Sequence, residues 1–304
     1  MVKKMRLDRE EKKYKDIRLA SIFGIIGNIF LLIIKGIVGF ITNSQAMIAD
    51  SVNSAGDILS SVMTYVGNRI ASKPGDDDHN LGHGKAEYIY SMLISIAMIA
   101  TALIILKDSV FVIINNQKYN FSVWLIIICL VTIITKFCLF LYTYGLSKKY
   151  NNLLIKANSK DHICDCFVTS ANLISCLLTL VNIYVFDGIV GIGISIWMLM
   201  TYVKIFIESF HVLMDKAMDE KTKELVYNIV KEHKEIIKTN HFNSTPVGYK
   251  YQISLTIFVD GNLSTFESHD IANRLEKEII SEIDNIYLAV IHVNPIDVRR
   301  KKNR

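Results

Sequence analysis

The sequence predicts an α-helical membrane protein, in which a six-helix transmembrane bundle is followed by a small α/β domain outside the bilayer. Hydrophobic residues make up 51% of the 304, and only three residues are proline. Apolar stretches long enough to cross a bilayer recur along the first part of the chain. Beyond them the composition becomes polar and amphipathic. We therefore expect a transmembrane domain at residues 1–212 and a second domain at 213–304, which ends in the basic tail RRKKNR.

Six stretches are predicted to cross the hydrocarbon core, which requires about 20 apolar residues for each helix. They are residues 17–41, 45–71, 88–106, 123–145, 153–181 and 187–207. The second and the fifth are the least apolar, which is typical of helices whose polar face looks into a bundle rather than toward lipid. The first stretch is too long for a signal-peptide core, so we expect it to remain in the protein as the first span.

Basic residues predict the orientation of these spans. Seven of the first sixteen residues are Lys or Arg, and others lie in the loops after the second and fourth spans and in the tail. Because positive loops remain in the cytosol, both termini are predicted to be cytosolic in a multi-pass protein of the cell membrane. The composition, rich in Ile, Lys and Asn, is typical of an AT-rich bacterial genome. The net charge of +5 is modest, so lipid and not nucleic acid is the expected partner.

The second domain combines helical and strand patterns. Residues 264–282 have the apolar spacing of an amphipathic helix, with Ser264 as a cap and Glu267 at capping-box spacing. Apolar and polar residues alternate between 249 and 257, as in a half-buried strand. The remaining predicted elements are a helix at 219–235 and strands at 238–243 and 286–293.

Acidic residues lie inside two of the predicted spans, where a charge at the helix centre costs about 2.5–3.5 kcal/mol. Asn53 and Asp57 are four residues apart in the second span, and Asp161 and Asp165 repeat this spacing in the fifth. Residues at this spacing share one face of a helix. Asp57 lies about 18 Å into its span at 1.5 Å per residue, close to the middle of the bilayer. We therefore predict one site near the midplane, to which both helices contribute oxygen ligands.

Three ionised carboxylates in one apolar site would repel one another if no other charge were present. Either a divalent cation or protons remove that repulsion, so metal binding has to displace protons. A site that exchanges protons for a metal at the midplane predicts a metal/proton antiporter, which is a secondary active transporter and not an enzyme. The simpler interpretation is that these side chains only hold helices together by hydrogen bonds.

Two other classes of function compete with transport. An intramembrane aspartyl protease would use two Asp residues that share a proton to activate water, but it needs neither Asn53 nor Asp161. A membrane metal sensor would need an output module, and only a short basic tail follows the last predicted strand. His162 is expected to lie off the ligand face and to pack. Lys35 and Lys136, which also lie within spans, either pair with carboxylates or extend toward the membrane surface.

Three segments of the chain resemble the cation diffusion facilitator family. They are NIFLLIIKGIVGFITNSQAMIADSVNSAGD at 28–57, DDDHNLGHGKAE at 76–87 and ANSKDHICD at 157–165. The resemblance implies a homodimeric, proton-coupled exporter of divalent transition metals, with six spans in each protomer and a cytosolic ferredoxin-like domain of αββαβ type. It also implies a transport site made of Asn53, Asp57, Asp161 and Asp165.

The ligand set implies which metal is transported. Zinc-type members of the family usually carry His at one or both of the positions held here by Asn53 and Asp161. Zinc favours nitrogen and sulfur, whereas Mn²⁺ is suited to carboxylate, carbonyl and water ligands. The set therefore resembles that of the manganese-exporting branch, with Fe²⁺, Zn²⁺ and Co²⁺ as alternatives. No cofactor is implied.

Asp76, His79 and His83 match a second metal site in the loop of some relatives. The two histidines are four residues apart, a spacing that allows both to bind one metal if the segment is helical. The alternative is that this acidic loop only attracts cations or packs at the dimer interface. Lys85 and Asp215 are candidates for a charged link between the membrane and soluble parts.

In the cytosolic domain, His241, His269 and His292 fall where relatives bind a regulatory divalent metal. Two other ligand positions of that site hold Ser254 and Asn294 in this chain. The three remaining histidines would suit zinc, or they would bind nothing and be ordinary surface residues.

Overall fold

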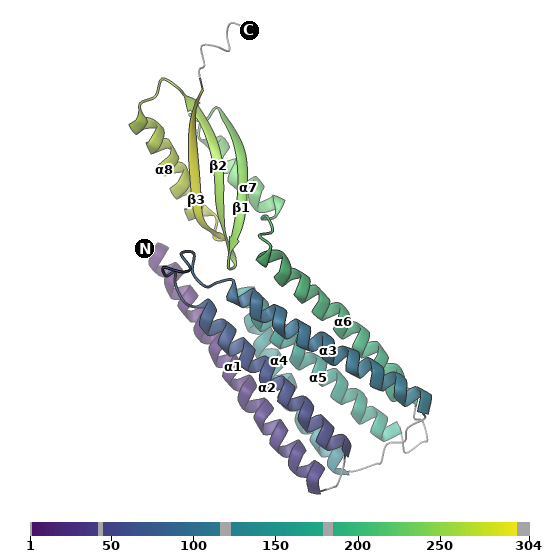
Figure 1. Cartoon of the computed structure of the whole chain (residues 1–304). Coiled ribbons are helices and arrows are strands. Elements are labelled where there is room, and N and C mark those ends of the chain that lie inside the picture. Colours follow the sequence, from purple (N-terminus) through teal and green to yellow (C-terminus); the bar gives the residue numbers. More distant parts are fainter. Residues whose placement is uncertain (1, 42–44, 116–122, 179–184, 297–304) are drawn as a thin grey trace. The chain divides into compact units, whose positions relative to one another are not determined.

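The computed structural model describes residues 2–41, 45–115, 123–178 and 185–296 (Figure 1). The chain divides into two compact units. The first contains the chain up to Pro74 and Ala86–Phe210, and the second contains Gly75–Lys85 and the chain from His211 onward. The predicted boundary at residue 212 lies close to that break. The sequence did not indicate that the loop at Gly75–Lys85 belongs to the second unit.

Six helices run through the first unit in the described part of the chain. They are α1 (Val2–Ile41), α2 (Gln45–Ala71), α3 (Ala86–Asn115), α4 (Val123–Tyr150), α5 (Leu153–Leu178) and α6 (Val185–Leu213). The predicted spans lie within these helices, except that residues 179–181 of the fifth fall outside the described residues. Several helices are longer than the spans, because polar residues with good helix propensity can continue a helix beyond the hydrocarbon core.

The polar helices have apolar neighbours. In the described part of the chain, the helices long and apolar enough to cross a membrane are α1, α3, α4 and α6. The other two, α2 and α5, were predicted to be the least apolar spans. α2 packs against α1, α3 and α5, and α5 packs against α3 and α4. This arrangement lets their polar faces avoid lipid.

The buried carboxylate of Glu87 connects three helices, α1, α3 and α5. Glu87 lies in the first turn of α3, and its Oε2 pairs with Lys13 Nζ of α1 at 3.4 Å. Its Oε1 accepts a hydrogen bond from the backbone N–H of Leu153, in the first turn of α5, at 2.9 Å. The first N–H groups of a helix have no partner within it. Glu87 therefore satisfies a buried donor and fixes where α5 begins relative to α1 and α3.

The second unit is an α/β domain with a three-stranded sheet (Figure 1). Its elements are α7 (Glu220–Glu232), β1 (Lys238–Val247), β2 (Lys250–Asp260), α8 (Thr265–Glu282) and β3 (Ile286–Ile296). β2 is the central strand, antiparallel to β1 and parallel to β3. The parallel pair needs a crossover connection, which α8 provides. The element order is the αββαβ order that the family resemblance implied.

The core of this domain lies between the sheet and its helices. Ile253, Leu255 and Ile257 on β2 are buried and cluster with Leu275 and Ile279 of α8. Buried apolar residues recur at every second position of β2, because successive side chains of a strand point to opposite faces, and Thr256 between them is also buried. This confirms the half-buried strand predicted from the sequence.

The predicted start of α8 is confirmed by its capping box. Ser264 Oγ accepts a hydrogen bond from the backbone N–H of Glu267 at 3.2 Å. In return, Glu267 Oε2 accepts one from the backbone N–H of Ser264 at 2.7 Å. The reciprocal pair satisfies two donors that the helix leaves unpaired. The negative charge of Glu267 in the first turn is also favourable toward the helix dipole.

Candidate metal site

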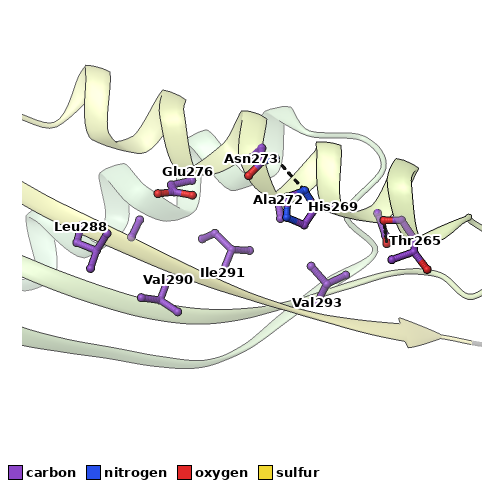
Figure 2. Close-up of a pocket in the computed structure, with 11 residues that line it drawn as sticks. Thr265, His269, Ala272, Asn273, Glu276, Leu288, Val290, Ile291 and Val293 are labelled. Atoms are coloured by element: carbon purple, nitrogen blue, oxygen red, sulfur yellow. Dashed lines mark hydrogen bonds between the residues drawn. The ribbon is translucent and has the colours of Figure 1, made fainter. Parts of the chain in front are cut away.

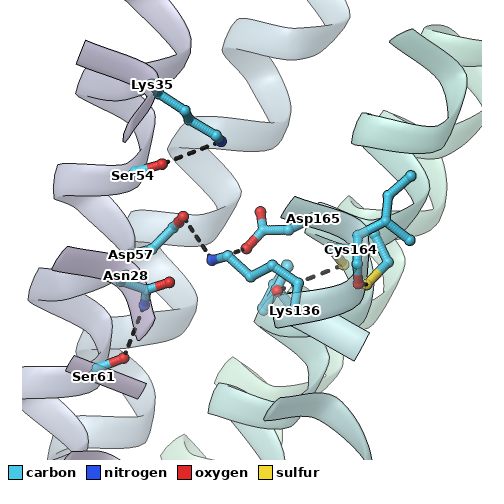
Figure 3. A network of polar contacts seen from close by, with 11 residues as sticks. Asn28, Lys35, Ser54, Asp57, Ser61, Lys136, Cys164 and Asp165 are labelled. Carbon is cyan, nitrogen blue, oxygen red and sulfur yellow. Dashed lines mark hydrogen bonds and ion pairs between the residues drawn. The ribbon is translucent and has the colours of Figure 1, made fainter. Parts of the chain in front are cut away.

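Three helices meet around the buried ammonium of Lys136 (Figure 3). Lys136 Nζ donates one hydrogen bond to Asp57 Oδ2 at 2.7 Å and one to Asp165 Oδ2 at 2.5 Å. These residues belong to α4, α2 and α5, respectively. The side chains of Lys136 and Asp57 are buried, and that of Asp165 is 17% exposed. Asp57 and Asp165, one from each polar helix, therefore share a single cation.

Asp161 lies one turn before Asp165 on α5 and is 1% exposed. Ligand atoms of these two carboxylates lie within 4.8 Å of each other. Asp161 Oδ2 has no hydrogen-bond partner among the described residues. An unpaired carboxylate oxygen inside a membrane bundle is costly, so this is an oxygen that a bound cation would stabilise.

Asn53 differs from the carboxylates in its exposure. It lies one turn before Asp57 on α2 and is exposed, whereas Asp57 and Asp161 are buried. Asp165 lies between these extremes. Exposure therefore increases from Asp57 and Asp161 toward Asn53 and Asp165, in the direction of the start of α2 and the end of α5. The four predicted ligands form a buried layer and a more open layer.

The structure corrects the expectation that His162 lies off the ligand face. A ring nitrogen of His162 lies within 4.8 Å of ligand atoms of Asp161 and Asp165. The ring is fully buried, and neither nitrogen has a hydrogen-bond partner in the described part of the chain. The signal was present in the sequence, because His162 and Asp165 are three residues apart and such residues are neighbours on a helix surface.

Ammonium, amide and hydroxyl groups near the carboxylates link α1 to α2. Lys35 Nζ donates to Ser54 Oγ at 3.2 Å, and Asn28 Nδ2 donates to Ser61 Oγ at 3.2 Å (Figure 3). Ser54 and Ser61 lie three residues before and four residues after Asp57, on the same face of α2. These contacts hold that face against α1.

Asp76, His79 and His83 come together in the loop, with ligand atoms within 4.8 Å of one another. A carboxylate oxygen of Asp76 lies 3.5 Å from a ring nitrogen of each histidine. The segment is not helical. A turn assembles the group instead, in which the backbone N–H of Gly82 donates to the carbonyl of His79 at 2.8 Å. The backbone N–H of His79 donates to Asp76 Oδ1 at 2.7 Å and lowers the pKa of that carboxyl.

The loop is also attached to the rest of the second unit. Lys85 Nζ pairs with Asp215 Oδ1 at 2.7 Å. Both residues belong to the second unit, so the pair is not the link between the membrane and soluble parts that the sequence suggested. One residue earlier, Gly84 approaches Gly248 in the turn between β1 and β2. A Cβ atom on Gly84 would lie 2.9 Å from Gly248 Cα, so this contact requires glycine.

The three predicted histidines of the second unit lie on separate elements. His241 lies at the irregularity of β1, His269 on α8 and His292 on β3. His269 contacts Asn273 at 2.9 Å beside an open groove of about 470 Å³ between α8 and β3 (Figure 2). Among the described residues, these histidines are not part of a group whose ligand atoms lie within 4.8 Å of one another. The structure does not bring these three histidines together among the described residues, and the regulatory site implied by the resemblance stays a prediction.

Both units match one family of transporters. A model of the cation efflux transmembrane domain matches residues 21–214, and a model of the cytoplasmic domain of cation efflux proteins matches residues 218–296. The chain belongs to this family, the cation diffusion facilitators. It is a membrane protein that exports a metal cation, and it is not an enzyme. The match of its second unit agrees with the expected homodimer.

Relatives of different origin resemble this transporter over most of its length. An uncharacterized transporter of Methanocaldococcus jannaschii is 28% identical over 283 residues, which cover 93% of this chain and 100% of the relative. The magnetosome protein MamB of Magnetospira is 24% identical over 264 residues, 87% of this chain and 90% of the relative. The manganese efflux system protein MneP of Bacillus subtilis is 24% identical over 286 residues, 91% of this chain and 96% of the relative.

Proposed function

We propose that this transporter exports Mn²⁺ in exchange for protons, by alternating access to a site made of Asn53, Asp57, Asp161 and Asp165. The observation that carries the proposal is the bridge at Lys136. Asp57 and Asp165 come from different helices, yet each directs one oxygen at the same buried cation. A shared metal ion would draw these oxygens closer together than the ammonium does, because Asp57 lies outside the group within 4.8 Å that Asp161, His162 and Asp165 form.

The proposed choice of Mn²⁺ rests on the donor set. The four side chains offer oxygen, which suits Mn²⁺ better than it suits zinc. The similarity to MneP, which is named as a manganese efflux protein, points in the same direction. His162 offers a nitrogen beside Asp161 and Asp165. It is the feature that favours the alternatives Fe²⁺, Zn²⁺ and Co²⁺.

The pattern of burial supports alternating access. Three polar residues, Ser60 on α2 and Asn158 and Ser159 on α5, lie beyond the buried layer of Asp57 and Asp161. Each has buried side-chain atoms without a hydrogen-bond partner in the part of the chain that the structure describes. Such groups are costly unless water or an ion reaches them. We propose that both termini lie in the cytosol. Ser60, Asn158 and Ser159 would then line the route from the cytosol to the site when the more open layer of Asn53 and Asp165 is closed.

Transport in proteoliposomes tests this function. We expect purified full-length protein to carry Mn²⁺ across the membrane when Mn²⁺, Fe²⁺ and Zn²⁺ are offered separately. The pH of the lumen should change in the direction of opposing proton movement, because metal binding displaces protons from the carboxylates. Zinc transport alone would overturn the choice of Mn²⁺. Metal transport without a pH change would overturn the proton exchange, and the absence of any flux in folded protein would overturn the site.

We also propose that Asp76, His79 and His83 bind a divalent metal in the loop. Two nitrogens and a carboxylate suit zinc better than they suit Mn²⁺. Replacing both histidines by alanine should remove one bound Zn²⁺ per chain, as measured by equilibrium dialysis, and leave Mn²⁺ flux nearly unchanged. Asp76, whose carboxyl pKa is lowered by the hydrogen bond from the backbone N–H of His79, should remain an ionised ligand to lower pH than an ordinary carboxylate. Unchanged zinc content in the double variant would exclude the site.

A further inference from the structure

Lys136 occupies the oxygens that the proposed metal would need. Its Nζ binds Oδ2 of Asp57 and Oδ2 of Asp165, and its side chain is 1% exposed (Figure 3). A lysine buried in a membrane bundle is costly and is kept by its partners. Here those partners are two of the proposed metal ligands, so the ammonium and a metal ion cannot both hold these oxygens at close range.

We propose that Lys136 is a tethered counter-cation of the transport site. It bridges Asp57 and Asp165 during the part of the cycle in which no metal is bound, and it withdraws when the metal binds. When it returns, it competes with the metal for the same oxygens and promotes release. This inference rests on the proposed transport site and adds a residue that sets how tightly that site holds its cargo.

The charges of the site favour this role. When ionised, Asp57, Asp161 and Asp165 carry three negative charges, and Lys136 carries one positive charge. Among these four groups the difference is two negative charges, and the buried ammonium of Lys35, which donates to Ser54 one turn from Asp57, adds a further positive charge nearby. A metal held among the carboxylates would repel the ammonium strongly at this depth, because there is little water to screen them. Metal binding should therefore displace the ammonium of Lys136, so that the two cations do not hold the carboxylates at the same time.

The structure offers one acceptor for the displaced ammonium outside the proposed ligands. Thr132 lies one turn before Lys136 on α4, and side chains of helical residues lean toward the preceding turn. Thr132 Oγ1 is buried and has no hydrogen-bond partner among the described residues. A small movement of the Lys136 side chain toward Thr132 would keep the ammonium hydrogen-bonded while it leaves the metal ligands.

Equilibrium Mn²⁺ binding to the purified full-length protein tests the proposal. Lys136→Met removes the competing charge and keeps a long unbranched side chain, so it should bind Mn²⁺ ~10-fold more tightly or better, because a nearby like charge opposes binding. Its turnover in proteoliposomes should fall because release is slower. Lys107→Met removes an exposed charge from α3 and should change neither quantity.

Thr132→Val keeps the charge and the volume but removes the acceptor for the displaced ammonium. It should weaken Mn²⁺ binding, which is the opposite direction to Lys136→Met. If Lys136→Met fails to fold, the Mn²⁺ affinity of Thr132→Val tests the proposal by itself. Affinity that is unchanged or lower in folded Lys136→Met, or unchanged in Thr132→Val, would overturn the role of Lys136. If the wild type itself neither binds nor transports Mn²⁺, the proposed function is overturned instead.

Discussion

Mn²⁺ flux should fall by at least ~100-fold when either Asp57 or Asp165 is replaced by alanine, since the loss of an outer-shell partner alone typically lowers metal affinity by about 10–100-fold and each substitution removes a proposed ligand itself. Each carboxylate is one of two that hold Lys136 in the structure and, as proposed, one of the ligands of the metal. Its loss removes a charged ligand and leaves the ammonium with a single partner. Flux into proteoliposomes measures the effect, at equal amounts of reconstituted protein.

Two observations separate loss of the site from loss of the fold. Variants that keep their fold should elute at the same position as the wild type in size-exclusion chromatography. Asp108→Ala removes an exposed carboxylate from α3 and should retain full flux. Normal flux in Asp57→Ala and Asp165→Ala together would rule out both residues as metal ligands.

The helices were predictable because their cause is local. Long apolar stretches cannot leave backbone groups unpaired in lipid, so they form helices. The same holds for the start of α8, where Ser264 and Glu267 satisfy each other's backbone donors within one turn. The loop at Gly75–Lys85 was assigned only by position. Its place in the second unit depends on the contact of Gly84 with Gly248, which no local pattern indicates.

The site was predictable in part for the same reason. The i, i+4 spacing put Asp161 and Asp165 on one face of α5, but it did not show what stands opposite them. Lys136 has a long flexible side chain, and the sequence left open whether it pairs with carboxylates or extends to the membrane surface. His162 follows Asp161 along the chain and was expected to point away from the ligand face. It is, however, a neighbour of Asp165 on the helix surface, because the two are three residues apart. Tertiary packing decided the case of Lys136, whereas the place of His162 follows from the local geometry of the helix.

Exchanging two proposed oxygen ligands for imidazole should move the preferred metal from Mn²⁺ toward Zn²⁺. In the double variant Asn53→His/Asp161→His, we expect the ratio of zinc to manganese flux to rise by ~10-fold or more, about 1.4 kcal/mol. Zinc binds nitrogen ligands more tightly than Mn²⁺ does, whereas oxygen ligands reduce that difference. Competition between the two ions in one proteoliposome preparation measures the ratio directly and cancels differences in the amount of protein.

Positions 53 and 161 differ in how well they accommodate an imidazole ring. Asn53 is exposed, so Asn53→His should fold and show part of the shift by itself. Asp161 is 1% exposed and lies beside the buried ring of His162, so a second ring there must displace its neighbours. Asn53→Gln keeps an amide oxygen at that position and should leave the ratio unchanged. If Asn53→His transports metal at the wild-type ratio, Asn53 does not reach the metal, and the nitrogen of His162 becomes the fourth ligand to test.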